Sequence, residues 1–170
     1  MSQVTEFASK LIDAIAAIRH ANDALSELAA QQRKAIARMD SGGLAMINAS
    51  QREAGRMLAD AEESRRQRVG ELARSLGLPP GASIDDLSRV LSTHDAALGQ
   101  ELRRSADEAR RAILSCQREQ RVVHEAATGV MAHLDGLARQ VLAKVNKAGL
   151  YAATGTMAFS ATPRGVDLVS

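Results

Sequence analysis

Residues 102–141 read LRRSADEARRAILSCQREQRVVHEAATGVMAHLDGLARQV, and their apolar side chains recur at alternating steps of three and four residues. Because an α-helix turns once every 3.6 residues, this spacing places them in one narrow stripe along a single helix. The stripe consists of Leu102, Ala106, Ala109, Ile113, Cys116, Val123, Ala127, Val130, Leu134, Leu137 and Val141. Such a stripe is typical of a coiled coil or slender bundle, which offers a surface to another helix and makes a poor pocket. We therefore expect a binding protein and not an enzyme.

Two earlier stretches of the chain have the same spacing. The first contains Val4, Phe7, Leu11, Ala14, Ile18, Ala21, Leu25 and Leu28, with Met39 in the same register. The second contains Leu44, Ile47, Ala54, Leu58, Ala61 and Leu72. Together the three stretches predict an all-α fold, an elongated antiparallel helical hairpin followed by a long C-terminal helix, in a bundle or coiled coil of three to four helices.

Residues that interrupt helices indicate where each element ends. The paired glycines of Asp40-Ser41-Gly42-Gly43 are expected to form the C-cap and turn of the first helix. Pro79-Pro80 follows the second helix, and Ser83 with Asp86 has the form of a helix N-cap. We expect one helical domain over residues 1–150 and a flexible tail over 151–170. The expected helices cover about 3–39, 44–76, 83–92 and 95–148.

Composition narrows the class of protein. Aromatic residues make up only 2% of the chain, whereas enclosed ligand sites usually depend on aromatic side chains. Cys116 is the only cysteine, so no intrachain disulfide can form, and its place on the stripe predicts a buried thiol. The uncharged N-terminal stretch is short and is broken by Asp13, so we expect neither a signal peptide nor membrane insertion. The expected location is the cytoplasm.

The titratable residues do not suggest a catalytic, cofactor or metal site. None of the four histidines has a second ligand at the spacing of a helical zinc site; they are His20, His94, His124 and His133. The chain also lacks a glycine-rich phosphate loop after a strand. We therefore expect no enzyme activity, no cofactor and no metal.

Arginines raise a second hypothesis, a helical rod that binds nucleic acid. Arg65, Arg66 and Arg68 cluster in the second helix, and Arg104, Arg111 and Arg118 lie seven residues apart in the last one. The favoured interpretation is a solvated face held by ion pairs, because carboxylates lie among these arginines and no aromatic residues interleave for base stacking. The expected pairs are Arg103–Asp107, Arg104–Glu108 and Asp107–Arg111. No nucleic-acid partner is expected.

Two glycines in the lower half of the last helix need an explanation, since glycine inside a helix costs up to about 1 kcal/mol relative to alanine. Gly129, Gly136 and Ala143 lie seven residues apart beside the apolar stripe. Three explanations remain open: close approach of a partner helix, weakness that lets this half remodel on binding, or tight packing inside the chain's own bundle. The expected partner-binding residues here are Gly129, Val130, Met131, Leu134, Gly136, Leu137 and Val141.

The order of these features resembles the FlgN family of flagellar type III export chaperones over nearly the whole chain. The matching segments are the turn at 40–44, the Glu-Glu-Ser-Arg-Arg run at 62–66, the stop at 76–78, the short helix at 83–87, the exit at 149–155 and the end at 164–168. The chain departs from the pattern at Gln117 and Gln120, where members often carry paired asparagines.

The resemblance implies a cytoplasmic chaperone of the hook-associated (hook-filament junction) proteins. It would bind their C-terminal amphipathic helices along the last helix, prevent premature assembly and degradation, and deliver them to the export gate. Tyr151, the sole tyrosine, would dock on the export apparatus; the alternative is a staple at the helix end. We expect a monomer or weak dimer. The main alternative function is a homodimeric coiled-coil scaffold.

Overall fold

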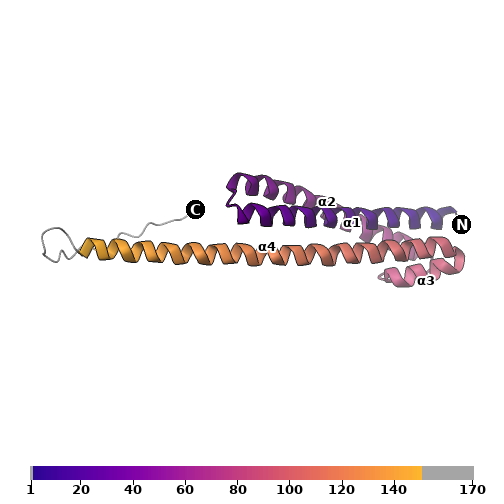
Figure 1. Ribbon diagram of the computed structural model, residues 1–170. Helices are drawn as coiled ribbons and strands as arrows, with labels where there is room; N and C mark the ends of the chain where they lie inside the picture. The colour runs from indigo at the N-terminus through magenta and orange to yellow at the C-terminus, as the bar shows by residue number, and fades with distance from the viewer. Residues whose placement is uncertain (1, 151–170) are drawn as a thin grey trace. The chain divides into compact units, whose positions relative to one another are not determined.

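The computed structural model describes the backbone of residues 2–150 and the side chains of residues 3–144. This part of the chain forms four helices and no strand (Figure 1), namely α1 Ser2–Ala37, α2 Ser41–Ser75, α3 Ile84–His94 and α4 Ala96–Leu150. The all-α prediction is therefore confirmed. The chain divides into two compact units, Met1–Ala127 and Thr128–Ser170.

Helices α1 and α2 form the predicted antiparallel hairpin and lie side by side in Figure 1. Near the turn, the Gln32 side chain donates to Asn48 Oδ1 at 3.2 Å and accepts from Gln51 at 2.9 Å. Toward the other end, Leu11 of α1 and Leu72 of α2 are fully buried in one cluster. Small residues on the buried side of α2, such as Ala54, suit two closely spaced helices.

The turn between α1 and α2 differs from the predicted glycine turn. Helix α1 ends in a Schellman motif in which Met39, and not a glycine, takes the left-handed conformation at φ 52°. Gly42 and Gly43 belong to the first turn of α2, because the Asp40 carboxylate caps that helix by accepting from Gly43 N–H at 2.8 Å. A side chain at Gly43 would clash with this carboxylate. The second helix therefore begins at Ser41 and not at Leu44.

Helix α3 pairs with the first turns of α4. Ser83 forms the predicted N-cap, since its Oγ accepts from Asp86 N–H at 3.1 Å and donates to Asp86 Oδ2 at 2.6 Å. The hydrogen bond from the Ser83 hydroxyl is the main reason that the pKa of the Asp86 carboxyl lies below its usual value. At the other end, the Asp95 carboxylate accepts from Leu98 N–H at 3.0 Å and so caps α4. Arg110 of α4 reaches back to Asp85 of α3 at 3.4 Å, so the two helices run antiparallel.

Helices α3 and α4 approach closely at Gly99. A Cβ at this position would lie 2.8 Å from two backbone atoms of α3, Ser88 O and Ser92 N. We predict that Gly99→Ala lowers the free energy of unfolding by about 1–3 kcal/mol, although alanine is the better helix former. Chemical denaturation followed by circular dichroism measures the change. The control is Gly55→Ala on α2, where nothing lies within 4 Å and stability should rise by up to about 1 kcal/mol. A stabilising effect of both substitutions would contradict the prediction.

The first half of α4 packs against the hairpin through its apolar stripe. The larger cluster contains Ala8, Leu11, Ile15, Leu72, Ala73, Leu87, Leu91, Leu102 and Ala109, and so joins all four helices. A second cluster, nearer the turn of the hairpin, contains Leu25, Ala54 and Cys116. The prediction of a buried Cys116 is confirmed, and burial raises the pKa of its thiol. Burial and a raised pKa both disfavour the reactive thiolate form.

Candidate partner-binding surface

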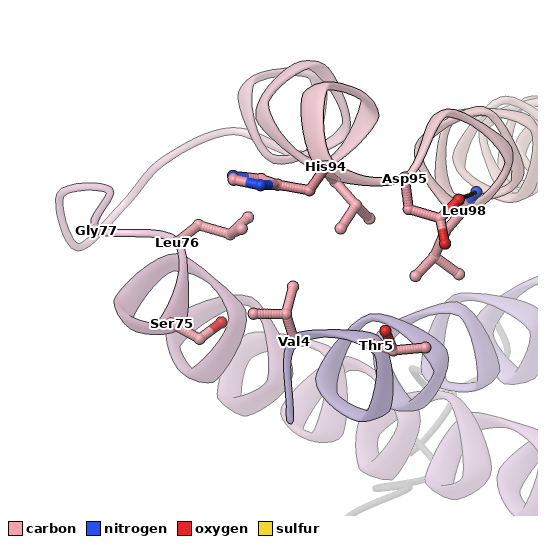
Figure 2. Close-up of a pocket in the computed structure, with 9 residues that line it drawn as sticks. Val4, Thr5, Ser75, Leu76, Gly77, His94, Asp95 and Leu98 are labelled. Carbon is pink, nitrogen blue, oxygen red and sulfur yellow. Dashed lines mark hydrogen bonds between the residues drawn. The ribbon is translucent and has the colours of Figure 1, made fainter. Parts of the chain in front are cut away.

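A cavity of about 560 Å³ lies in the unit Met1–Ala127, where one end of the hairpin meets the α3–α4 junction. Figure 2 shows that Val4, Leu76 and Leu98 surround it with aliphatic side chains, beside the imidazole of His94. Two of the polar neighbours are engaged with the backbone: Asp95 caps α4 at Leu98 N–H, and the Ser75 hydroxyl donates to Leu72 O at 2.8 Å. The cavity therefore has a mixed lining of aliphatic side chains and of the polar residues Thr5, Ser75, His94 and Asp95.

Metal-binding clusters and membrane-spanning helices are both absent from the described residues. No group of three or more histidine, cysteine, aspartate and glutamate side chains in this part of the chain is arranged to hold a metal ion. Nor does any helix there combine the length and apolar character that crossing a membrane requires.

The apolar stripe of α4 changes from buried to exposed along the helix. In the unit up to Ala127, most stripe residues from Leu102 to Val123 lie in the core. Farther along, the stripe is open to solvent, since Leu134 and Leu137 are each 44% exposed and Val141 is 60% exposed. Met131 beside the stripe is also exposed, while Val130 is half-buried. An apolar strip of this length in contact with water is typical of an interaction site.

The predicted partner-binding residues lie on one segment of α4, with one exception. The seven residues from Gly129 to Val141 all belong to α4, whereas Tyr151 lies outside the described residues. Leu142 was missed, because the heptad pattern ends the stripe at Val141. Its side chain is 60% exposed and widens the apolar strip. The sequence signal that could have found it is that two large apolar residues, Val141 and Leu142, stand next to each other at the end of the stripe.

Gly129 and Gly136 have open space where a side chain would stand. A Cβ at either position meets no atom within 4 Å beyond the helix's own neighbouring backbone. Close approach of a partner helix, local weakness of α4 and packing inside the chain's own bundle all stay open as explanations.

Substitution of both Gly129 and Gly136 by alanine shows whether these glycines weaken the helix, admit a partner backbone, or do both. We predict that Gly129→Ala with Gly136→Ala slows amide hydrogen exchange in this part of α4, because each change favours the helix by up to about 1 kcal/mol. The matched control is Ala143→Gly, at the third position of the same heptad series, which should speed exchange. Unchanged exchange in the double variant would contradict the prediction. If a partner backbone packs against the glycines, the double variant also binds that partner more weakly.

The ion pairs predicted within α4 are wrong, whereas the arginine cluster at residues 65–68 of α2 is paired. Asp107 pairs with Arg110 at 2.9 Å and not with Arg103 or Arg111. Glu108 faces α1 and pairs with Arg19 at 2.6 Å, because the nearby helix offers a part-buried partner. The three clustered arginines of α2 pair as Arg65–Glu62, Arg66–Glu63 and Arg68–Glu71.

Comparison with known proteins identifies the family. A family model described as FlgN protein matches residues 1–158, which include all four helices. No curated protein and no solved structure matches the chain. The matched region covers far more than half of the sequence and contains both the hairpin and the exposed strip of α4. The chain therefore belongs to the FlgN family, a family of flagellar export chaperones.

Proposed function

We propose that this protein is a cytoplasmic chaperone of the flagellar hook-associated proteins. It binds their C-terminal amphipathic helices, prevents premature assembly and degradation, and delivers them to the type III export gate. Membership of the FlgN family supports a chaperone of flagellar proteins and not an enzyme. The choice of the hook-associated subunits follows from the family resemblance of the sequence, and the choice of their terminal helices agrees with the shape of the exposed strip.

The observation that supports a helix as cargo is the exposed apolar strip of α4. A cargo helix with one apolar face can lie along Leu134, Leu137 and Val141, so that both apolar faces leave the water. Met131 lies beside this line, and its flexible thioether adapts to different apolar neighbours. Gly129 and Gly136 leave room for the cargo backbone to approach, since nothing described lies within 4 Å of a side chain placed there.

Moderate affinity suits a chaperone that must release its cargo. A dissociation constant of about 1 μM corresponds to roughly 8 kcal/mol. Burial of a large apolar side chain contributes about 1.5–3 kcal/mol, so a few anchors on this strip are sufficient after the cost of ordering is subtracted. The proposed anchors are Val130, Leu134, Leu137 and Val141.

The proposed contact with the export apparatus is Tyr151. It is the single tyrosine of the chain and follows Leu150, the last residue of α4. A tyrosine at such a position offers an apolar ring and one hydroxyl to a partner. A Tyr151→Ala variant that binds cargo normally but fails to support export of that cargo in cells would support this role.

Calorimetry with cargo peptides tests the proposed function. The full chain is titrated with synthetic peptides that cover the C-terminal helices of the hook-associated proteins of its source organism. We expect saturable one-to-one binding with a negative heat-capacity change, the mark of apolar surface leaving water. A peptide of the same composition in scrambled order, which has no apolar face, is the control. Absence of binding by every such peptide would contradict the proposal.

The alternative, a homodimeric coiled-coil scaffold, is supported by the same exposed strip. A second copy of the chain can cover the heptad positions from Leu134 to Val141 as well as a cargo helix can. Sedimentation equilibrium across a range of concentrations distinguishes the two. A monomer or weak dimer that binds cargo one to one agrees with the chaperone, and a tight dimer that binds no cargo peptide agrees with the scaffold.

A further inference from the structure

A second surface lies on the outward side of α4 in the unit Met1–Ala127. It consists of Arg104, Arg111, Leu114, Arg118 and Arg121, and we call it the arginine face. These residues recur at steps of three, four and seven, so they share one side of the helix, about half a turn away from the buried stripe of Leu102 and Cys116. All five side chains are exposed.

The guanidinium groups of this face have no partner among the residues that the structure describes. None of its four arginines takes part in an ion pair or hydrogen bond in this part of the chain. Two neighbouring carboxylates are bound by α1: Glu108 pairs with Arg19, and Glu119 lies 3.7 Å from Arg33. Asp107, on the same side of α4 as the face, pairs with Arg110 at 2.9 Å, and Glu125 is an exposed carboxylate at its end. The hairpin thus engages two acidic side chains of α4, and the four arginines of the face outnumber the two carboxylates that share its side of the helix.

Leu114 places an apolar group among these charges. It is 57% exposed and lies between Arg111, three residues before it, and Arg118, four residues after it. A leucine with basic neighbours on both sides is complementary to an apolar residue with acidic neighbours on both sides. Amphipathic helices present this combination at helical spacing.

The spacing of the arginines favours a protein helix over nucleic acid. Arg104, Arg111 and Arg118 are seven residues apart, which corresponds to about 10.5 Å along the axis, and acidic residues at heptad positions of a second helix have the same repeat. Nucleic-acid phosphates lie much closer together, about 3.4 Å of axis per nucleotide on each strand.

We propose that the arginine face binds an acidic amphipathic helix of a protein partner, aligned along α4. Glutamates or aspartates at heptad spacing face Arg104, Arg111 and Arg118, and an apolar residue between them packs on Leu114. This site shares no residue with the exposed apolar strip of α4 at residues 129–142, which we call the cargo strip. The protein can therefore hold a cargo helix and an acidic helix through separate parts of α4.

The test uses the full chain and a designed peptide of about 21 residues, three heptads, with glutamate once per heptad and one central leucine. Fluorescence anisotropy measures its dissociation constant at low and high salt. We expect salt to weaken binding, and R104E/R111E/R118E to weaken it about tenfold or more, since each exposed pair changes affinity about two- to fivefold. The same variant should instead bind a peptide with lysine in place of each glutamate. Leu114→Ser should weaken binding of the glutamate peptide without changing its salt dependence.

Matched controls assign the effect to this face. R52E/R56E/R66E makes the same change of net charge on exposed positions of α2 and should leave the dissociation constant within about twofold. L134D/L137D should also leave it unchanged, because the cargo strip is a different surface. If circular dichroism shows that the triple reversal on α4 loses helix, R104Q/R111Q/R118Q removes the charges without adding repulsion.

Three results would overturn the proposal. If R52E/R56E/R66E weakened binding of the glutamate peptide as much as R104E/R111E/R118E does, the peptide would be attracted by net charge alone. Loss of peptide binding in L134D/L137D would place the peptide on the cargo strip. Tighter binding of a DNA duplex than of the acidic peptide, with the same arginine dependence, would make the face a nucleic-acid site.

Discussion

The double variant Leu134→Asp, Leu137→Asp is expected to bind hook-associated cargo peptides about 100-fold more weakly than the parent chain. Each leucine is 44% exposed and supplies apolar surface that the cargo helix would cover. Its replacement removes that gain and puts a carboxylate into the apolar contact, where desolvation of the charge opposes binding. A 100-fold loss corresponds to about 2.7 kcal/mol, well within the combined contribution of two such side chains.

Calorimetry and circular dichroism together check this result. Because both leucines are exposed, helical content should be preserved, and the free energy of unfolding should change by less than about 0.5 kcal/mol per site. The matched control is Met46→Asp with Met57→Asp, which places the same charges on exposed methionines of α2 and should leave cargo affinity unchanged. Cargo binding at the parent affinity by the leucine double variant would show that the strip is not the cargo site. Absence of binding by the parent chain would contradict the proposed function itself.

Leu72→Ala is expected to lower the free energy of unfolding by about 2–5 kcal/mol. Leu72 is completely buried in the larger cluster, which joins all four helices. Alanine there loses the transfer free energy of the removed atoms and leaves a cavity among neighbours such as Leu11 and Leu87, which only partly relax. Because the cluster is shared, the loss weakens the packing of the whole unit Met1–Ala127 and not of one helix.

Urea denaturation measures the loss, with Leu114→Ala as the control. Leu114 is 57% exposed, so its truncation should change the free energy of unfolding by no more than about 0.5 kcal/mol. The midpoint of the Leu72→Ala curve should fall while its slope stays the same, because the surface exposed on unfolding is nearly unchanged. Similar stability of the two variants would show that the four-helix cluster does not hold this unit together.

The first turn of α2 shows where sequence patterns become ambiguous. Glycines after a helix favour a C-cap, but they also permit the capping carboxylate of the next helix to approach its backbone. In this chain Asp40 captures Gly43 N–H, and Met39 accepts the left-handed conformation instead of a glycine. Residue preferences alone do not decide whether residues 40–43 form the C-cap of α1 or the N-cap and first turn of α2.

The ion pairs show a second limit. Spacing along one helix identifies carboxylates within reach of Arg103, Arg104 and Arg111, but it does not include the groups of other helices. Glu108 pairs with Arg19 because α1 lies against that side of α4. Arg104 is left without Glu108 as a result of this packing, and no pattern within residues 102–141 contains that information.

The sequence by itself determined the helical class, the antiparallel hairpin, the short capped helix after Pro80 and the long last helix. These features follow from local rules, the helical period and the residues that begin or end helices, so they can be derived without knowing what lies nearby. Only the tertiary structure decided how one continuous heptad stripe divides into a buried half and an exposed half. Burial and charge pairing of a side chain depend on which residues of the neighbouring helices face it. These neighbours are set by the packing of several helices and cannot be read from one helix alone.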